Sequence, residues 1–343
     1  MLPPRTAEAR ALEVARALPG DRVLGVTLGR VQTLAALAEE RPAGRAVCWM
    51  LDEHHANLAR QSALPANLSI VCAADPPEEP FDLAVVPVSM RGEAELARET
   101  LQELAQRLSP DGVLVAASDN PRDSWLRQQM DALLPGVRLH RFSDAVVYSV
   151  VKQQPLKRRR DFSCEFAFRD RQRLLQAVSR PGVFSHRRVD PGARRLLEAL
   201  EEAAGENVLE IGCGAGVVSL ALAAHLPQAQ VLAVDSHTRA VQCTQRGAEL
   251  NALPNLRVLC NATGEYPAAG TFDLAIANPP YYADHAIAQR MMAAAARSLK
   301  PAGRLLVVTK TPGWYFQQLD DATWGSLQTE EVKRYHLVRA IRR

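Results

Sequence analysis

The stretch VLEIGCGAGVVSLALA, residues 208–223, decides the fold. An apolar run leads into three glycines, Gly212, Gly214 and Gly216, and a helical pattern follows them. Glycine tolerates left-handed backbone and lets the chain approach a ligand closely, while a helix N-terminus offers free N–H groups. The order of strand, glycine turn and helix predicts the first turn of a doubly wound α/β domain, with a ligand at the carboxyl ends of the strands.

Acidic residues accompany this turn. Glu210 precedes the first glycine by two positions, and Asp235 and Ser236 end the next apolar run, VLAVDS. The Asp235 carboxylate can accept hydrogen bonds from both hydroxyls of a ribose. A dinucleotide loop, GxGxxG, would need glycine where Val217 stands. The spacing acid-x-G-x-G-x-G instead resembles motif I of class I S-adenosylmethionine-dependent methyltransferases, in which the strand-end acid lies near the methionine amino group. A dinucleotide loop and a glycine turn without ligand are the alternatives.

A shorter apolar run, 255–260, ends at Asn261 and Ala262. In the methyltransferase superfamily that this loop resembles, the residue at this turn often contacts the adenine ring. The Asn261 amide can donate to a ring nitrogen and accept from the exocyclic amine. A turn or helix-cap role explains the same residue equally well, so both interpretations stand.

The second motif, DLAIANPPYY, ends another apolar run with Asn278, Pro279, Pro280 and Tyr281. Proline fixes φ and donates no hydrogen bond, so this loop is expected to be rigid with its carbonyls available. The Asn278 side-chain oxygen and the Pro279 carbonyl can both accept from a planar NH₂ group, and Tyr281 can stack on its face. Methylation of such a nitrogen depends on orientation more than on a strong base. The motif resembles motif IV of amino-methyltransferases, and a structural Pro-Pro turn is the alternative.

The chain contains an internal repeat. FDLAVVPVSM at 81–90 matches FDLAIANPPY at 272–281, and LSPDGVLV matches LKPAGRLL at the same 191-residue offset. VLGVTLGRV from Val23 matches VLEIGCGAG from Val208 at an offset of 185. Three matches in one order predict two copies of one α/β domain.

Apolar runs and helical patterns support this organisation. In the second copy they predict strands at 206–211, 229–235, 255–260, 272–277 and 302–309, with a closing hairpin after them. The first copy repeats the plan with strands near 22–27, 45–51, 68–72, 81–87 and 112–118. Runs at 162–168 and 172–178 predict a small hairpin between the copies.

The net charge of +3 conceals an uneven distribution. Residues 1–151 carry a net −5, residues 196–343 carry −1, and residues 152–195 carry +9. Arginine suits phosphate geometry and stacks on bases, so a basic segment beside the predicted cleft favours an RNA-contacting surface over a merely solvated linker. The candidate RNA-binding residues are Lys157, Arg158, Arg159, Arg160, Arg187 and Arg188.

At this point the whole chain resembles the bacterial ribosomal RNA guanine-N2 methyltransferases of the RsmC/RlmG type. The resemblance rests on the duplication, on RPGVFSHRRVDPGARRLLEAL at 180–200, on NPPYY and on the ending KRYHLVRA. Its carboxyl half matches well and its amino half mainly in plan, and Tyr282 stands where the family commonly has histidine. The resemblance implies that Phe184 lies beside the cofactor or base and that Asn278 to Tyr281 hold a guanine.

The resemblance also implies a fold of two tandem Rossmann-like class I methyltransferase domains. We expect a degenerate first domain at 1–150, a basic linker and hairpin at 151–189, and a catalytic domain at 190–343. Opposite Glu210, Gly212 and Gly216 the first copy has Gly25, Thr27 and Val31, and opposite Asn278 to Tyr281 it has Pro87 to Met90. The first domain is therefore expected not to bind S-adenosylmethionine.

Other features bound the function. No apolar run reaches the 18 residues of a membrane span, the start lacks the apolar core of a signal peptide, and the six cysteines form no CxxC pair. We therefore expect a reduced, cytoplasmic setting, no membrane, no metal and no disulfide framework. The oligomeric state is left open, with a monomer as one option.

The leading hypothesis is an enzyme that uses S-adenosylmethionine to methylate the exocyclic N2 amine of a guanine in ribosomal RNA, with the small subunit as the expected substrate. The NPPY motif by itself also fits adenine N6, cytosine N4 and the glutamine side-chain nitrogen. Alternatives are therefore a glutamine-N5 protein methyltransferase and an adenine-N6 nucleic-acid methyltransferase. A non-catalytic RNA-binding factor in ribosome assembly is the alternative from another class.

Overall fold

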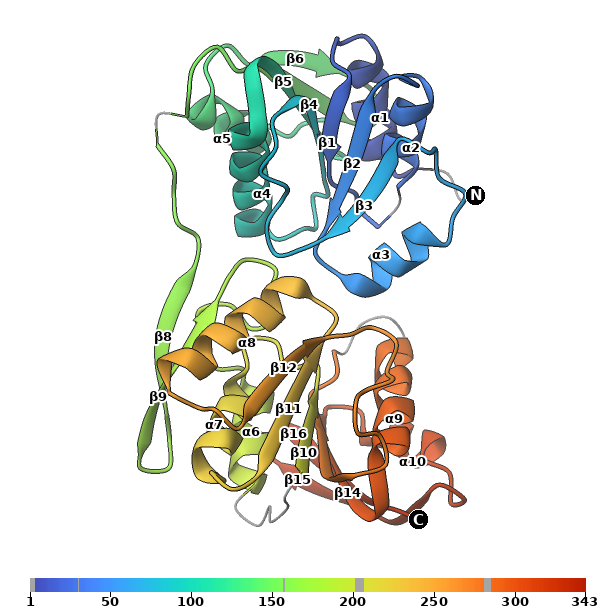
Figure 1. The fold of residues 1–343 in the computed structure, drawn as a ribbon, viewed down its shortest axis with the longest axis vertical. Helices are drawn as coiled ribbons and strands as arrows, with labels where there is room; N and C mark the ends of the chain where they lie inside the picture. The colour runs from blue at the N-terminus through green and yellow to red at the C-terminus, as the bar shows by residue number, and fades with distance from the viewer. Residues whose placement is uncertain (1–3, 30, 157, 201–206, 281–284) are drawn as a thin grey trace. The chain divides into compact units, whose positions relative to one another are not determined.

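Figure 1 shows a computed structural model of the chain, which describes residues 4–29, 31–156, 158–200, 207–280 and 285–343. The chain divides into two compact units, Met1–Phe162 and Ser163–Arg343. Within the described ranges, no helix has both the length and the apolar character needed to cross a membrane. The same ranges hold no cluster of three or more His, Cys, Asp or Glu residues suited to a metal ion.

Each unit is built on one seven-stranded sheet, and the two sheets share one strand order: β3-β2-β1-β4-β5-β7-β6 in the first and β12-β11-β10-β13-β14-β16-β15 in the second. The first five strands in each order are parallel, and the last two join in antiparallel pairing. From β10 the chain adds β11 and β12 on one side, and then returns to add β13 and β14 on the other side. Ligands bind at such a switch point, between β10 and β13, in open α/β sheets.

The elements have the following bounds. The first unit contains α1 (Thr6–Arg16), β1 (Arg22–Gly25), α2 (Gln32–Glu39), β2 (Arg45–Met50), α3 (Glu53–Arg60), β3 (Leu68–Cys72), β4 (Phe81–Val88), α4 (Ala94–Arg107), β5 (Leu108–Ser118), α5 (Trp125–Leu133), β6 (Arg138–Arg141) and β7 (Val146–Val151). The second contains β8 (Cys164–Asp170), β9 (Arg173–Ser179), α6 (Pro191–Ala199), β10 (Asn207–Ile211), α7 (Val217–His225), β11 (Gln230–Asp235), α8 (Thr238–Leu250), β12 (Leu256–Cys260), β13 (Phe272–Ala277), α9 (Ala286–Ser298), β14 (Leu299–Thr309), α10 (Pro312–Gln318), β15 (Trp324–Val332) and β16 (Tyr335–Arg342).

The central strands are mostly apolar because helices cover both faces of each sheet. Alternate residues of β13 show this directly: Leu274 and Ile276 join the cluster with α6 and α7, while Ala275 and Ala277 join the cluster with α9 and α10. The first unit is layered in the same way, with α1 to α3 on one face and α4 and α5 on the other. The fold class predicted from the sequence is confirmed.

The repeat is confirmed as well. Helices α1 and α6 and strands β1 and β10 begin at the 185-residue offset, and β5 and β14 correspond at 191. The antiparallel pair of the first copy, β6 and β7, was not predicted. β6 reads Arg-Leu-His-Arg and has no buried residue, so it lacks the apolar run by which a strand is recognised.

The predicted hairpin is formed by β8 and β9 and belongs to the second unit. Phe168, Leu175 and Ala177 join the core cluster of that unit. The side chain of Asn251, at the end of α8, accepts from the Gln176 N–H at 2.9 Å and donates to the Gln176 carbonyl at 2.6 Å. The hairpin is therefore anchored to α8 by both apolar packing and paired hydrogen bonds.

Candidate functional site

The glycine loop, residues 212–216, follows β10 and is left-handed at all three glycines, with φ of 81°, 56° and 75°. A Cβ on Gly214 would lie 1.9 Å from the Phe184 carbonyl oxygen, and one on Gly216 would lie 2.6 Å from Thr244 Oγ1. The Phe184 carbonyl also accepts from the Ala215 N–H at 2.9 Å. Glycine is thus required here both by the backbone conformation and by close packing.

Glu210 is buried at the end of β10, with 4% of its surface exposed. Its carboxylate accepts from the Ser219 N–H at 2.9 Å and from the Ser219 hydroxyl. Gly216, the N-cap of α7, has no side chain to satisfy the first turn of the helix, so Glu210 supplies the acceptor instead. Burial raises the pKa of Glu210 to about 8, against the opposing effect of the Ser219 hydrogen bonds. At neutral pH most of this carboxyl therefore carries a proton.

Asp235 ends β11 and faces the glycine loop. One carboxylate oxygen accepts from the Gly214 N–H at 2.8 Å and the other from the His237 N–H at 2.9 Å. A carboxylate has about four acceptor positions, so these two contacts fix its orientation and leave capacity for ligand hydroxyls. Ser236 follows it, and its carbonyl accepts a long contact of 3.8 Å from the Cys260 thiol.

Asn261 and Ala262 form the turn after β12. The Asn261 N–H donates to the Asp235 carbonyl at 2.9 Å, which brings the turn to the edge of the glycine-loop site. Its side-chain oxygen accepts from the Thr263 and Gly264 N–H groups at 2.9 and 3.1 Å, and its NH₂ donates to the Glu265 carbonyl. These contacts are those of an Asx turn, so a structural role accounts for the side chain.

Asn278 follows β13 at the same edge of the sheet as the glycine loop, because β10 and β13 are parallel neighbours. Its Nδ2 donates to Asp190 Oδ2 at 3.0 Å. Pro279 is buried and Pro280 partly exposed. Tyr281, the fourth residue of the predicted motif, lies outside the described residues.

Residues 180–190, here the β9–α6 segment, join the hairpin to α6. Phe184 contacts the glycine loop through its carbonyl while its ring is 61% exposed. Asp190, six residues later, contacts Asn278. Between them, Ser179 Oγ accepts from the Arg187 N–H at 2.9 Å and Ser185 Oγ donates to the Arg188 carbonyl at 2.6 Å. The segment therefore contacts both predicted loops and exposes Arg187 and Arg188 between these contacts.

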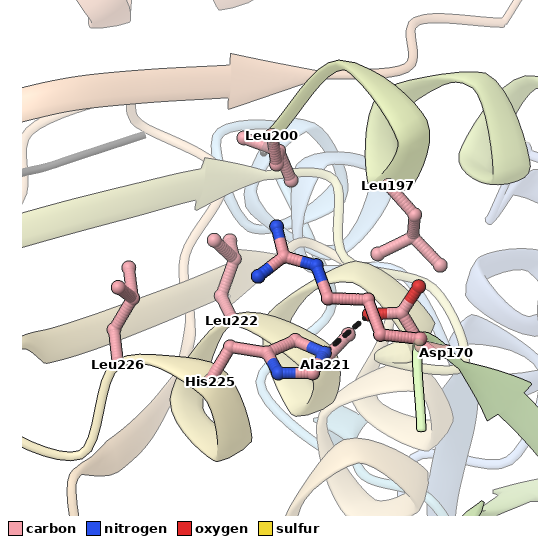
Figure 2. A pocket seen from close by; sticks show the side chains of 8 residues that line it. Asp170, Leu197, Leu200, Ala221, Leu222, His225 and Leu226 are labelled. Carbon is pink, nitrogen blue, oxygen red and sulfur yellow. Dashed lines mark hydrogen bonds and ion pairs between the residues drawn. The ribbon is translucent and has the colours of Figure 1, made fainter. Parts of the chain in front are cut away.

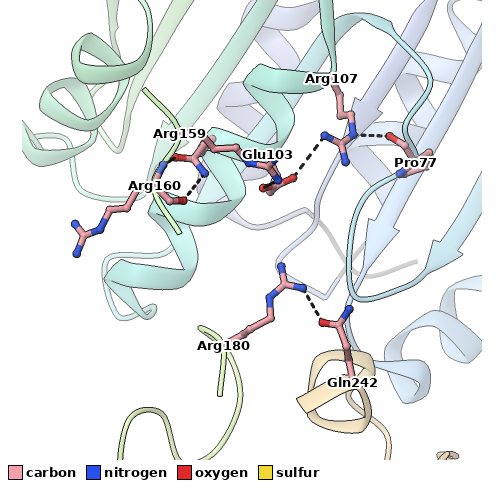
Figure 3. Close-up of polar contacts among 8 residues, drawn as sticks. Pro77, Glu103, Arg107, Arg159, Arg160, Arg180 and Gln242 are labelled. Carbon is pink, nitrogen blue, oxygen red and sulfur yellow. Dashed lines mark hydrogen bonds and ion pairs between the residues drawn. The ribbon is translucent and has the colours of Figure 1, made fainter. Parts of the chain in front are cut away.

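The basic run at the end of the first unit lies against α4 (Figure 3). The side-chain amide of Gln102 pairs with the Arg160 backbone, donating to its carbonyl at 2.9 Å and accepting from its N–H at 2.8 Å. Arg159 forms an ion pair with the buried Glu103 at 3.2 Å, and the Arg160 guanidinium lies 5.1 Å from the centre of the Phe162 ring. Arg158 is exposed, and Lys157 lies outside the described residues. Arg159 therefore has a structural partner, unlike what the sequence alone indicates.

A cavity of about 50 Å³ lies elsewhere in the second unit (Figure 2). Asp170 and His225 line it, with Asp170 Oδ2 and His225 Nε2 2.6 Å apart, among leucines of α6 and α7. His225 is the last residue of α7, whereas the glycine loop precedes the first. The cavity is therefore at the opposite edge of the sheet from the predicted site and includes none of its residues.

Comparison with known proteins agrees with this geometry. Residues 175–339 match the family model of the methyltransferase small domain. The match covers most of the second unit, which is therefore similar to a methyltransferase small domain. The match includes the hairpin strand β9, the β9–α6 segment, the glycine loop and the NPP motif. Together with the relatives below, it confirms the family resemblance predicted from the sequence.

Two curated relatives are named ribosomal RNA small subunit methyltransferase C. The protein of Chromohalobacter salexigens is 33% identical over 176 residues, and that of Alcanivorax borkumensis is 36% identical over 176 residues. These alignments cover 49% and 48% of this chain and 52% of each relative, so the matched part spans about half the length of these proteins.

The duplicated architecture has a counterpart among solved structures. A 16S rRNA N2 methyltransferase of T. thermophilus (RsmC), solved in complex with AdoMet and guanosine, aligns with a TM-score of 0.80. The alignment covers 98% of this chain and 92% of that chain at 23% identity. It shows that the folds of the two units, in this order along one chain, have a counterpart in a solved structure.

Sequence reasoning missed two contributions to the site. Thr244 of α8 packs against Gly216 and donates to the Gly214 carbonyl at 3.1 Å. The contact of Asp190 with Asn278 joins residues 88 positions apart. Asp190 before Pro191 does signal a helix start, but no local pattern reveals which distant loop an N-cap will contact.

Proposed function

We propose that this protein transfers the methyl group of S-adenosylmethionine to the exocyclic N2 amine of a guanine in ribosomal RNA of the small subunit. The observation that carries the proposal is the placement of three features at the carboxyl ends of β10, β11 and β13: the left-handed glycine loop, the Asp235 carboxylate and the Asn278-Pro279-Pro280 turn. The names of the curated relatives and the guanosine bound by the T. thermophilus protein support this substrate.

The residues present fit this cofactor. The left-handed backbone of Gly212, with φ of 81°, favours glycine at the first turn of the loop. Asp235 would hold ribose hydroxyls, the turn of Ser236, Asn261 and Ala262 would border the adenine, and Phe184 would shield one side. The protonated Glu210 would ionise beside a cationic amino group, since a nearby positive charge favours the carboxylate.

The second part of the site orients the acceptor. S-adenosylmethionine would supply a methyl group on a cationic sulfur: as the amine lone pair forms the N–CH₃ bond the S–CH₃ bond breaks, S-adenosylhomocysteine leaves as a neutral thioether, and the amine gives up one proton to solvent. The Asn278 side-chain oxygen and the Pro279 carbonyl would accept from the N2 amine and thereby aim its lone pair; Tyr281, which the sequence predicts to stack on the base, lies outside the described residues. A base held in this way is unpaired or flipped out of its stack.

Nucleoside mass spectrometry tests the proposal directly. Purified protein is incubated with labelled S-adenosylmethionine and, separately, with small ribosomal subunits, naked rRNA and a release factor. We expect label in RNA as N2-methylguanosine and none in the release factor. N6-methyladenosine or methylglutamine as product would identify one of the alternative acceptors, and no transfer to any substrate would favour a non-catalytic role.

We also propose that the first unit does not bind S-adenosylmethionine. The loop equivalent to the glycine loop contains Thr27 and Leu28, and both donate to the buried Glu8 carboxylate, at 2.5 and 3.0 Å. Glu8 lies on α1, and the equivalent residue of α6 is Ala193. The Glu8 carboxylate thus accepts the hydrogen bonds of the loop groups that would otherwise be available to a ligand.

The exposed basic residues of both units contact RNA phosphates in this proposal. Replacing Arg187 and Arg188 together with glutamine should weaken RNA binding and lower the slope of log Kd against log salt by about 1.5, since each lost phosphate contact removes about 0.7–0.9. Fluorescence anisotropy with a small-subunit rRNA fragment across a salt series measures both quantities.

Arg246→Gln is the matched control, because Arg246 is an exposed arginine of the same unit that pairs with Glu249 at 2.9 Å. Arg158→Gln should act like the pair with about half the effect on slope. Arg159 is unsuitable, because its removal would weaken the pairing of buried Glu103. An unchanged slope in the Arg187/Arg188 variant would remove these residues from the RNA surface.

A further inference from the structure

We propose that Asp190 is a positioning residue that fixes the side-chain amide of Asn278 with its oxygen toward the substrate amine. This inference rests on the proposed function and adds to it a residue outside the NPPY and glycine motifs. Among the described residues, the Asp190 side chain accepts from Asn278 and from the Ala193 N–H of α6, so its route to the acceptor site runs through Asn278.

The chemistry of the contact fixes the direction of the amide. Asp190 Oδ2 accepts from Asn278 Nδ2 at 3.0 Å and from the Ala193 N–H at 3.1 Å. An ionised carboxylate has only acceptors, so only the NH₂ end of the Asn278 amide can face it. The Asn278 oxygen is then kept from Asp190 Oδ2, and in the proposed function this oxygen is the atom that has to accept from the substrate nitrogen.

Without such a partner the amide would have two orientations. The terminal torsion of asparagine is broad and roughly two-fold, so rotation exchanges the oxygen and the NH₂ group. A rotated amide would present a donor to an amine that also donates. The rigid Pro279-Pro280 backbone leaves this torsion as the main freedom of the residue, and Asp190 restricts it.

Close packing at Gly192 supports a site built around this contact. A Cβ on Gly192 would lie 2.8 Å from Asp190 Oδ2 and 3.1 Å from Asn278 Oδ1. No positive φ requires glycine at this position, because Gly192 is an ordinary residue of α6. The glycine therefore provides space for the two side chains to meet.

The first unit provides an internal comparison. Helix α1 begins at the same repeat position as α6, and its N-cap is Arg5 where α6 has Asp190. The position equivalent to Asn278 is Pro87. A guanidinium has no acceptor and proline has no side-chain amide, so both halves of the contact are absent from the copy that lacks the other motifs.

Asp190→Ser separates positioning from helix capping. Serine caps a helix about as well as aspartate, but its shorter side chain retracts the oxygen from Asn278. We expect kcat for rRNA methylation to fall about tenfold to a hundredfold, the scale of a misplaced reacting group, while the Kd for S-adenosylmethionine by calorimetry stays within about twofold. Asp190→Asn keeps one oxygen that can accept both hydrogen bonds, so it should retain most of the activity.

The double variant tests whether Asp190 acts through Asn278. Asp190→Ser should lower the residual single-turnover rate of Asn278→Ala no further, because the amide to be oriented is gone. Wild-type kcat in Asp190→Ser, or equal losses in Asp190→Ser and Asp190→Asn, would overturn the proposal.

A readout without activity keeps this result distinct from the proposed function. Urea midpoints of the four cofactor-free proteins of the cycle should be non-additive, because the two side chains share one hydrogen bond. Additive midpoints would refute the contact itself. If wild-type protein methylates no RNA while the midpoints are non-additive, the proposed function fails and the contact stands.

Discussion

Asn278→Ala should lower kcat at least about a thousandfold while leaving the Kd for S-adenosylmethionine nearly unchanged. Loss of one preorganised hydrogen-bonding group costs about 10²–10³ in kcat, and here the same change also releases the amine from its aimed orientation. Single-turnover transfer of labelled methyl groups to rRNA measures the rate, and calorimetry measures the affinity. Asp235→Ala should give the reverse pattern, because the Asp235 carboxylate accepts from the Gly214 N–H of the glycine loop, which is proposed to hold the cofactor.

Asn255→Ala is the matched control for this prediction. The Asn255 amide donates to the carbonyls of Ala223, Leu226 and Ala229 at 3.0–3.1 Å, at the edge of the sheet remote from the site. Its loss should lower the melting temperature and leave kcat of the folded protein intact. Asn278→Ala should instead lower kcat strongly, and its loss of the hydrogen bond to Asp190 should lower the melting temperature less than the loss of the three Asn255 bonds does. More than a tenth of wild-type kcat in Asn278→Ala would refute the role assigned to that side chain.

Gly214→Ala should abolish detectable binding of S-adenosylmethionine to the full chain. Its Cβ would lie 1.9 Å from the Phe184 carbonyl oxygen, a backbone atom that cannot move without displacing both the glycine loop and the β9–α6 segment. The left-handed backbone at φ 56° adds roughly 1–2 kcal/mol of strain for alanine. We expect at least about a hundredfold loss of affinity by calorimetry.

Two glycines isolate the effect of backbone strain. Gly270 and Gly29 have φ of 78° and 96°, and a Cβ on either would meet no described atom within 4 Å. Gly270→Ala and Gly29→Ala should therefore cost some stability and no cofactor affinity. Gly29 is also the repeat equivalent of Gly214. If Gly214→Ala still bound one molecule of S-adenosylmethionine, this would reveal a second site and contradict the proposal that the first unit binds no cofactor.

The sequence predicted the sheet, and the glycine and NPP turns at one end of its strands, because those features are local. The glycine spacing indicates the end of one apolar strand, and the NPP turn indicates the end of another. Parallel pairing places such strand ends at the same edge of the sheet. Buried runs in both copies announced the five parallel strands. These signals depend on neighbouring residues alone, so no tertiary information was needed to find them.

The remaining features depend on contacts distant in sequence. Arg159 belongs to a basic run that indicates a solvated or RNA-binding surface, yet it pairs with Glu103, 56 residues away. Glu210 fits a cofactor acid, but it also caps α7 through Ser219. Asn261 could have offered its amide to a ligand, and its turn uses both ends of that amide. In each case the residue type allowed several partners and only packing selected one.

The β9–α6 segment has a further consequence for how such an enzyme can change. Phe184 contacts the loop predicted to hold the methyl donor, and Asp190 contacts the loop predicted to hold the acceptor. The length of the chain between them therefore limits how far apart the two loops can lie. An insertion within this segment would leave the sequence of both loops intact and change their positions relative to each other. The outward side chains at 187 and 188 can vary without altering that length. If the proposed function holds, the selection of RNA and the geometry of the reaction can therefore evolve separately within this segment.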